Sequence, residues 1–268
     1  MIYILVAFTA LLTAACSQTI VFDEINEVVP PVSTTIQDNQ IWYTTTNGKG
    51  VSTIMSGVVS NTYENGKGII TFDRPIDVIT VDAFYNCAEL KSVQLPQTVM
   101  AIEETAFGQC TSLSSIKLSN ELRNIGPQAF SGCTALVSIT IPDSVEQIEQ
   151  RSFCDCTALK SVTFGATSRD ASSSNLRIIG QCAFQNCTSL VNITLPSKLE
   201  IIAEDAFANC TSLMSITIPQ SVNHVENNVF IGCSSLKEFN GKFATSGQSS
   251  PLHHSRLRCS RNQYMFLQ

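Results

Sequence analysis

The sequence predicts an α/β solenoid of seven coils, each about 23 residues long, preceded by a small N-terminal β cap. Three observations predict it: a fixed period, an alternating apolar pattern inside each period, and an apolar content of 44% with only 14% charged residues. The period is set by the pattern Ala-Phe-x-x-Cys-(Thr/Ser), which recurs with small changes. Its phenylalanines are 23 residues apart except for one interval of 31, and they are Phe84, Phe107, Phe130, Phe153, Phe184, Phe207 and Phe230. Such a period is typical of stacked coils that bury their apolar edges against their neighbours.

Each coil is predicted from the order of its residues. The stretch 136–142, Leu-Val-Ser-Ile-Thr-Ile-Pro, has alternating apolar positions and β-branched residues, so Ile139 and Ile141 are expected to point inward from a strand. The proline that closes the stretch lacks an amide hydrogen and ends the strand. Val145 and Ile148 form a second inward edge. The Ala-Phe-x-x-Cys segment has the spacing of a short helical turn, which gives the α/β class.

Seven of the eleven cysteines occupy one phase of the repeat, three residues after each phenylalanine: Cys87, Cys110, Cys133, Cys156, Cys187, Cys210 and Cys233. We interpret this column as a ladder of buried free thiols, because free cysteine packs as a small hydrophobe. Disulfides between adjacent coils are the alternative, although an odd number of cysteines cannot all pair. Cys154, Cys182 and Cys259 lie outside the column and are expected to be the more reactive thiols.

Residues 1–15 form an apolar run that ends in small residues directly before Cys16. The run is too short to span a bilayer and has the character of a signal peptide. Because Leu-Thr-Ala-Ala-Cys resembles a bacterial lipobox, we expect lipidation of Cys16 and an outer-membrane lipoprotein exposed at the surface of the cell envelope. A secreted protein and an unprocessed membrane anchor are the alternatives. Residues 16–40, which are acidic and contain a Pro-Pro pair, are expected to form a lipid-anchored tether.

The folded part is expected to begin with residues 41–80, which form the N-terminal β cap and half a repeat. The repeats occupy residues 81–243. The long interval between phenylalanines comes from a Ser-rich insertion, which we interpret as a surface loop on one coil, with a specificity loop as the alternative. Residues 244–268 lose the period and are expected to form an irregular, disordered tail.

The outward strand positions are the candidate ligand-binding face. Their side chains form columns rich in hydroxyl groups, with apolar spots and scattered lysines. Many weak contacts on such a repetitive face bind an extended partner by avidity; the alternative is that Ser and Thr simply suit exposed strands. The candidate residues are Lys91, Gln94, Lys117, Val137, Thr140, Lys160, Thr163, Val191, Thr194, Met214 and Thr217.

The sequence offers no catalytic constellation, so we expect neither an enzyme nor a cofactor. His253, His254 and Cys259 have the element types of a zinc site but lack the spacing of its ligands, so no metal is expected either. The net charge is −6 and basic residues cluster only in the tail, which argues against nucleic acid as a partner.

The units AFGQCTSLSSIKL, AFSGCTALVSITIPDSVEQI and AFANCTSLMSITIPQSV resemble the BspA-like branch of bacterial leucine-rich repeats, and the resemblance covers roughly residues 40–242. Residues in IWYTTTNGK and NTYENGKGIITFDRPI look like the N-terminal cap of that branch. The resemblance implies a right-handed leucine-rich-repeat superhelix and adhesion to host matrix proteins or other cells. It implies no catalytic residues, and the tail departs from its pattern.

Two functional hypotheses follow, with a third beside them. The first is a surface adhesin that binds a protein ligand on host or neighbouring cells through the exposed strand face. The second is a glycan-capturing surface lipoprotein, for which Trp42, Tyr43 and Tyr63 would be the stacking residues. The third is a structural envelope component without a soluble ligand.

Overall fold

The computed structural model describes residues 35–165 and 173–240. The expected signal peptide, Cys16, most of the tether, most of the Ser-rich insertion and the tail 244–268 lie outside these residues. The described residues contain the strands β1 (Gln40–Thr45), β2 (Val58–Glu64), β3 (Lys67–Phe72), β4 (Val78–Ile79), β5 (Leu90–Gln94), β6 (Ala101–Ile102), β7 (Ser115–Lys117), β8 (Asn124–Ile125), β9 (Ser138–Ile141), β10 (Gln147–Ile148), β11 (Ser161–Phe164), β12 (Ile178–Ile179), β13 (Asn192–Thr194), β14 (Ile201–Ile202), β15 (Ser215–Thr217), β16 (His224–Val225) and β17 (Glu238–Asn240).

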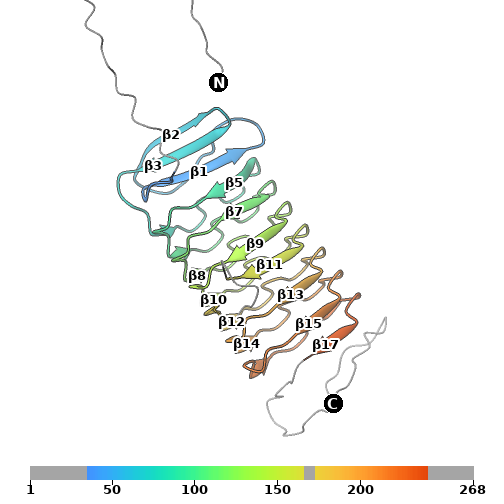
Figure 1. The fold of residues 1–268 in the computed structure, drawn as a ribbon. Helices are drawn as coiled ribbons and strands as arrows, with labels where there is room; N and C mark the ends of the chain where they lie inside the picture. The colour runs from blue at the N-terminus through green and yellow to red at the C-terminus, as the bar shows by residue number, and fades with distance from the viewer. Residues whose placement is uncertain (1–34, 166–172, 241–268) are drawn as a thin grey trace, which may run out of the picture. The chain divides into compact units, whose positions relative to one another are not determined.

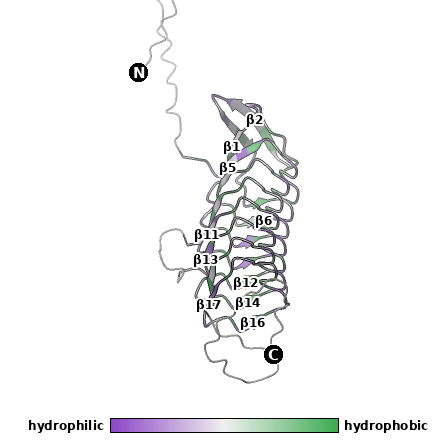
Figure 2. Cartoon of the chain, turned by 90° about the vertical axis from the view of Figure 1, so that its right-hand side faces the viewer, coloured by the Kyte–Doolittle hydropathy of each residue, from purple (hydrophilic) through white to green (hydrophobic). Residues whose placement is uncertain are grey.

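The strands stack as two columns of a β-solenoid (Figure 1). The two-residue strands form one parallel sheet of seven, in the order β16-β14-β12-β10-β8-β6-β4. The longer strands β9, β11, β13, β15 and β17 form a second parallel sheet. The side view shows β11, β13 and β17 on one side of the stack and β12, β14 and β16 on the other (Figure 2). The apolar side chains between the two columns make one continuous core.

The N-terminal strands form a third sheet of different construction. β1 pairs antiparallel with β3 and with β5, and β2 pairs antiparallel with β3. β5 then pairs in parallel with β7, which gives the order β2-β3-β1-β5-β7. The inward side chains of β1, Ile41 and Tyr43, are buried and belong to the same continuous core as the coils.

The expected helical turn around each phenylalanine is wrong, and the α/β class is corrected to a β-solenoid: the described ranges contain no helix. Two residues per coil, two positions before and two positions after the phenylalanine, have positive φ; for Phe130 they are Gln128 (54°) and Gly132 (73°). A left-handed residue on each side interrupts right-handed helical geometry. Nor is there any helix long and apolar enough to cross a membrane in the described part of the chain.

Backbone hydrogen bonds replace the helix with a ladder of turns. The amides of Gln128, Phe130 and Gly132 each donate to a carbonyl in the next coil, at 2.8–2.9 Å. The intervening amides close local turns, as when Ser131 donates to Gln128 at 3.0 Å. Because alternate amides leave the coil, the i→i−4 bonds of an α-helix cannot form. The phenylalanine rings of successive turns stack at centroid distances of 5.2–5.8 Å with interplanar angles of 3–11°.

The cysteine column consists of free thiols, and all but the first of them are buried. Each buried thiol donates a hydrogen bond to the phenylalanine carbonyl of the coil before it, at 3.1–3.3 Å; Cys133 bonds Phe107 in this way. Burial raises the pKa of the Cys110 thiol to about 12. The expectation that Cys154 and Cys182 are reactive is wrong, because both are at most 5% exposed and burial raises the pKa of each.

Candidate binding face on the exposed strands

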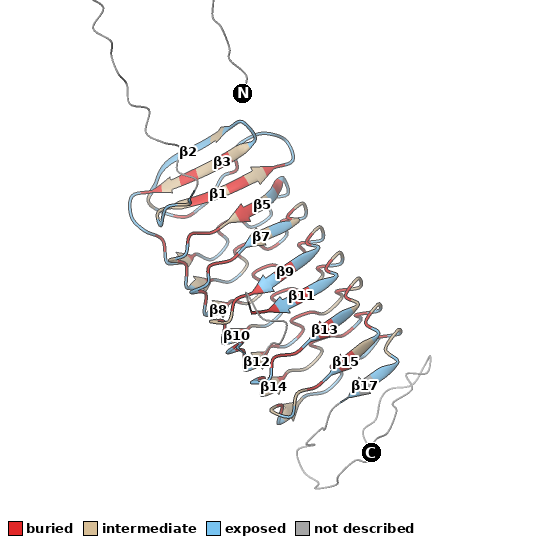
Figure 3. Cartoon of the chain, in the orientation of Figure 1, coloured by how far each residue is buried: buried red, intermediate tan, exposed pale blue. Residues whose placement is uncertain are grey.

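The outward positions of the longer strands lie in register across coils. Ser161 pairs with Ser138 and Asn192, and Thr163 pairs with Thr140. Thr194 pairs with Thr217 in the same way. Equivalent side chains are therefore aligned in columns, one strand spacing apart, and β9, β11, β13 and β17 show the exposed colour along these columns (Figure 3).

The structure places the predicted face residues on this surface. Gln94 and Val191 are half-buried, and the other nine are exposed: Lys91, Lys117, Val137, Thr140, Lys160, Thr163, Thr194, Met214 and Thr217. Val137 and Met214 are 42% and 46% exposed, so they are apolar spots open to a partner. Their coils hold them there because their inward neighbours Leu136 and Leu213 fill the core.

The charges on this surface are mainly lysine ammonium groups. Lys91, Lys117 and Lys160 form no ion pair within the described residues. The ion pairs in that part of the chain lie elsewhere: Arg177 with Glu200, and His224 with Glu226 at 3.6 Å. Within that part of the chain, no carboxylate therefore neutralises these three ammonium groups.

The face has one interruption. β7 and β9 are neighbours along the stack, but the described strands contain no ladder between them. β5 and β7 belong to the N-terminal sheet, whereas β9 begins the next one. Ile116 in β7 is only partly buried at this junction. The candidate face therefore consists of two blocks of strands, which sequence periodicity did not predict.

The aromatic residues of the glycan hypothesis do not share a surface. Tyr43 is 2% exposed, and its hydroxyl donates to the Asn61 amide oxygen at 2.7 Å and accepts from the Val51 amide. Tyr63 packs against Tyr43 with ring centroids 5.8 Å apart. Trp42 extends the strand face beside Gln94, but the Lys67 ammonium covers its ring, with Nζ 2.9 Å from the centroid.

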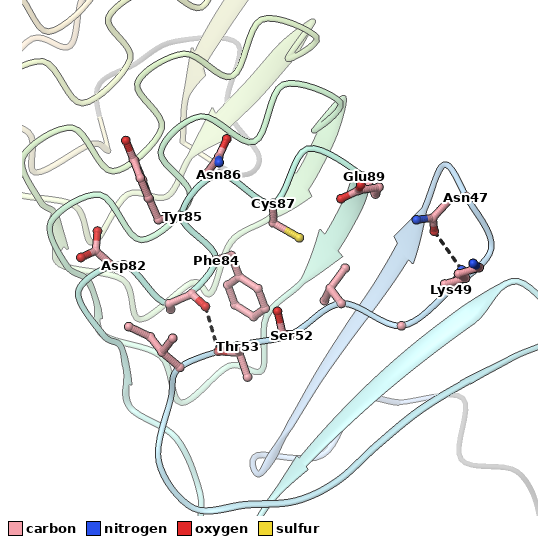
Figure 4. Close-up of a pocket in the computed structure, with 14 residues that line it drawn as sticks. Asn47, Lys49, Ser52, Thr53, Asp82, Phe84, Tyr85, Asn86, Cys87 and Glu89 are labelled. Carbon is pink, nitrogen blue, oxygen red and sulfur yellow. Dashed lines mark hydrogen bonds between the residues drawn. The ribbon is translucent and has the colours of Figure 1, made fainter.

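Sequence reasoning missed a cleft at the N-terminal end of the solenoid (Figure 4). It has a volume of about 370 Å³ and lies between the loop of residues 47–54 and the first phenylalanine turn, residues 82–89. Figure 4 shows the Phe84 ring and the Cys87 sulfur pointing toward the loop. The signal that was available is that Cys87 is the first cysteine of its column and has no coil before it.

The described ranges hold no group of three or more His, Cys, Asp or Glu side chains arranged to bind a metal ion. His253, His254 and Cys259 lie outside those ranges. The paired carboxylates of the coils, such as Glu103 and Glu104, are exposed. The chemistry that the described surface offers is therefore recognition by hydroxyl, ammonium and apolar groups.

Comparisons with known proteins agree with this architecture. The chain matches the family described as BspA type Leucine rich repeat region, in six copies over residues 60–174 and 168–250. The phenylalanine pattern predicted seven coils. A crystal structure of the Treponema pallidum leucine-rich repeat protein is 32% identical with a TM-score of 0.56, covering 61% of this chain and 73% of that one.

Two further structures are more distant. A leucine-rich cell-surface protein from Faecalibacterium prausnitzii is 23% identical with a TM-score of 0.32, and covers 62% of each chain. The pneumococcal vaccine antigen PcpA is 20% identical with a TM-score of 0.40, covering 69% of this chain and 39% of that one. No curated protein matches the chain. With the family match covering well over half of its residues, the chain belongs to the BspA-type leucine-rich repeat family.

Proposed function

We propose that this chain is a cell-surface protein that binds a protein partner through its exposed strand face, in adhesion to host matrix proteins or other cells. The observation that carries the proposal is the register of the face: hydroxyl columns lie beside a column that holds exposed Val137 and Met214. Lys91, Lys117 and Lys160 on the same face form no ion pair within the described residues. A protein surface supplies the complementary carboxylates and apolar groups. Each single contact is weak, and their number gives the affinity.

The location and the finer architecture belong to the same proposal. Cys16 carries the lipid anchor, and residues 16–40 hold the solenoid at the surface of the outer membrane; a secreted form is the alternative. The solenoid has seven coils, which the seven phenylalanines support, with the strands before β5 as its cap. Its right-handed winding is supported by the handedness of parallel strand crossovers in general.

The test is binding of the purified chain to immobilised matrix proteins, with a glycan array in parallel. Glutamate at Thr140, Val191 or Thr194 should weaken saturable protein binding about tenfold or more, because an unpaired charge buried at an interface costs more than the roughly 1.4 kcal/mol of a tenfold change. Asn223→Glu is the matched control, since Asn223 is exposed in the loop before β16.

Each arm of this experiment has a contrary outcome. Protein binding that all three substitutions leave unchanged would remove the strand face from the proposal. Binding only to glycans, lost on Trp42→Ala, would favour the glycan-capturing alternative. No binding to either the matrix proteins or the glycans would favour the structural envelope component.

A further inference from the structure

The first coil begins a hydrogen-bond ladder that every later coil continues. At each junction, three amides of one phenylalanine turn donate to three carbonyls of the next; those of Asp82, Phe84 and Asn86 bond the carbonyls of Glu104, Ala106 and Gly108. These bonds are 2.7–3.2 Å long at all junctions. The accepting carbonyls therefore point toward the N-terminal end of the stack.

In the first coil, the equivalent carbonyls belong to Val81, Ala83 and Tyr85, and no coil precedes them. The Thr53 hydroxyl of the loop 47–54 donates to the Ala83 carbonyl at 2.9 Å, which places this loop where the missing coil would lie. The carbonyls of Val81 and Tyr85 accept no hydrogen bond from any described residue. The loop thus supplies one donor in place of three.

The same position lacks an acceptor for Cys87. Every other thiol of the cysteine column donates to the phenylalanine carbonyl of the preceding coil, whereas the Cys87 thiol has no acceptor among the described residues. Cys87 is half-buried and lines the cleft. Tyr85 lines the cleft as well, and Val81 directly precedes Asp82 in its wall. The cleft and its edge therefore present two carbonyl acceptors and one thiol donor, a set that the backbone of another extended segment complements.

The charged groups of the cleft favour a basic ligand. Two carboxylates line it, Asp82 and Glu89, against the single ammonium of Lys49. The Glu103 carboxylate lies close by, where it accepts from the Val81 amide at 3.1 Å. None of these carboxylates forms an ion pair within the described residues.

We propose that this N-terminal cleft is a second binding site, and that it takes an extended peptide segment bearing an arginine or lysine side chain. The backbone of the segment donates to the carbonyls of Val81 and Tyr85 and offers a carbonyl to the Cys87 thiol. Its basic side chain meets Glu89 and Asp82. The site is separate from the strand face, and it stands or falls independently of the adhesive function.

Protection of Cys87 from alkylation tests this proposal. The full chain carrying Cys16→Ser and Cys259→Ser retains Cys87 as its half-buried thiol, because the other described cysteines are buried. The probe is a short blocked peptide, Gly-Thr-Arg-Thr-Arg-Thr-Gly, titrated against the rate of Cys87 alkylation measured by mass spectrometry. The peptide should slow alkylation saturably. Glu89→Gln should raise the concentration for half-protection about two- to fivefold, the range expected for an exposed ion pair.

Three comparisons make the result decisive. Glu146→Gln, an exposed carboxylate outside the cleft, should leave half-protection unchanged. The alkylation rate of each variant is divided by its own rate without peptide. This is needed because Glu89 also raises the pKa of the Cys87 thiol, after the larger effect of burial, so Glu89→Gln changes the reactivity of Cys87 by itself. Equal protection by a peptide with glutamate in place of arginine would overturn the charge argument. Equal protection by the N-methylated peptide, or no protection at millimolar concentration, would overturn the site.

Discussion

Removal of one phenylalanine ring from the middle of the stack should destabilise the whole solenoid. Phe130 is fully buried and lies between Phe107 and Phe153, with centroids 5.3 and 5.2 Å away and interplanar angles of 4° on both sides. Phe130→Ala should lower the free energy of unfolding by about 3–5 kcal/mol, the cost of a large buried aromatic truncation. Phe130→Leu keeps much of the apolar volume but loses two ring pairs, so about 1–3 kcal/mol is expected.

Phe84 provides the matched comparison because it stacks on a ring at one face only. Its partner is Phe107 at 5.2 Å, and the loop 47–54 lies at its other face. Phe84→Ala should therefore cost about 0.5–1.5 kcal/mol less than Phe130→Ala, the worth of one ring pair.

Urea unfolding followed by two signals measures these differences. Far-ultraviolet circular dichroism reports all strands, and fluorescence reports the N-terminal sheet, because Trp42 is the only tryptophan in the chain. Nearest-neighbour coupling predicts that Phe130→Ala separates the two transitions, with Trp42 unfolding at the higher urea concentration. A loss below about 1 kcal/mol for Phe130→Ala, the level of an ordinary substitution, would refute the stacked column as a source of stability.

Two further predictions concern the thiols and the turns. Burial raises the pKa of the Cys110 thiol to about 12 from an unfolded value of 9.0. The part of the free energy of unfolding that depends on this proton is therefore fully present below pH 9 and should fall as the pH rises toward 12, by up to about 1.4 kcal/mol per pH unit. Urea unfolding from pH 8 to 11 should show a shallower decline for Cys110→Ala than for the parent chain, and equal slopes would contradict the assignment. Asn186 has φ of 60°, and its side-chain amide donates to the Asp155 carboxylate at 2.7 Å. Asn186→Ala should therefore lower the free energy of unfolding by about 1–2 kcal/mol, measured by thermal or urea unfolding. Asn186→Gly should recover the part due to backbone strain, and equal losses in both variants would show that only the side-chain hydrogen bonds matter.

The stacking of coils could be predicted because it depends on period alone. Phenylalanine every 23 residues with an alternating run after it leaves one way to bury the apolar positions, and the outward residues follow from the same alternation. The ladder of buried cysteines was predictable for the same reason, since one phase of a solenoid meets itself in every coil.

The conformation of the phenylalanine turns was harder to predict, although part of the sequence signal for their left-handed residues was present. The position two residues after the phenylalanine is Asn, Asp or Gly in six coils, as at Asn86, Asp155 and Gly132, and these residues tolerate positive φ best. The other left-handed position holds residues such as Arg151 and Cys182, which give no such signal. The i, i+3 spacing of Phe and Cys therefore suggested a helix that the alternating backbone bonds exclude.

The N-terminal cleft was missed because it depends on a mismatch between two kinds of structure, and the one sequence signal for it was the position of Cys87 at the start of its column. In the interior coils, the amides of one phenylalanine turn pair with the carbonyls of the next, so these turns have few unpaired backbone groups to offer a ligand. The loop 47–54, which joins β1 to β2, lies at the Phe84 ring but cannot reproduce the three donors of a coil, and its Thr53 replaces only one of them.

This contrast predicts different selectivity for the two surfaces. The strand face repeats similar side chains from coil to coil, so a partner shifted by one coil meets nearly the same groups, and recognition there depends on the number of contacts. The cleft occurs once among the described residues, and the first coil fixes the Tyr85 carbonyl, the Cys87 thiol and the two carboxylates in it relative to each other, with the Val81 carbonyl at its edge. Binding to the repetitive face therefore gains affinity from many contacts but does not fix the position of the partner along the stack. Binding to the single cleft fixes that position through a few specific contacts. A chain that binds at both surfaces would therefore hold a partner broadly along its length and in one orientation at its N-terminal end.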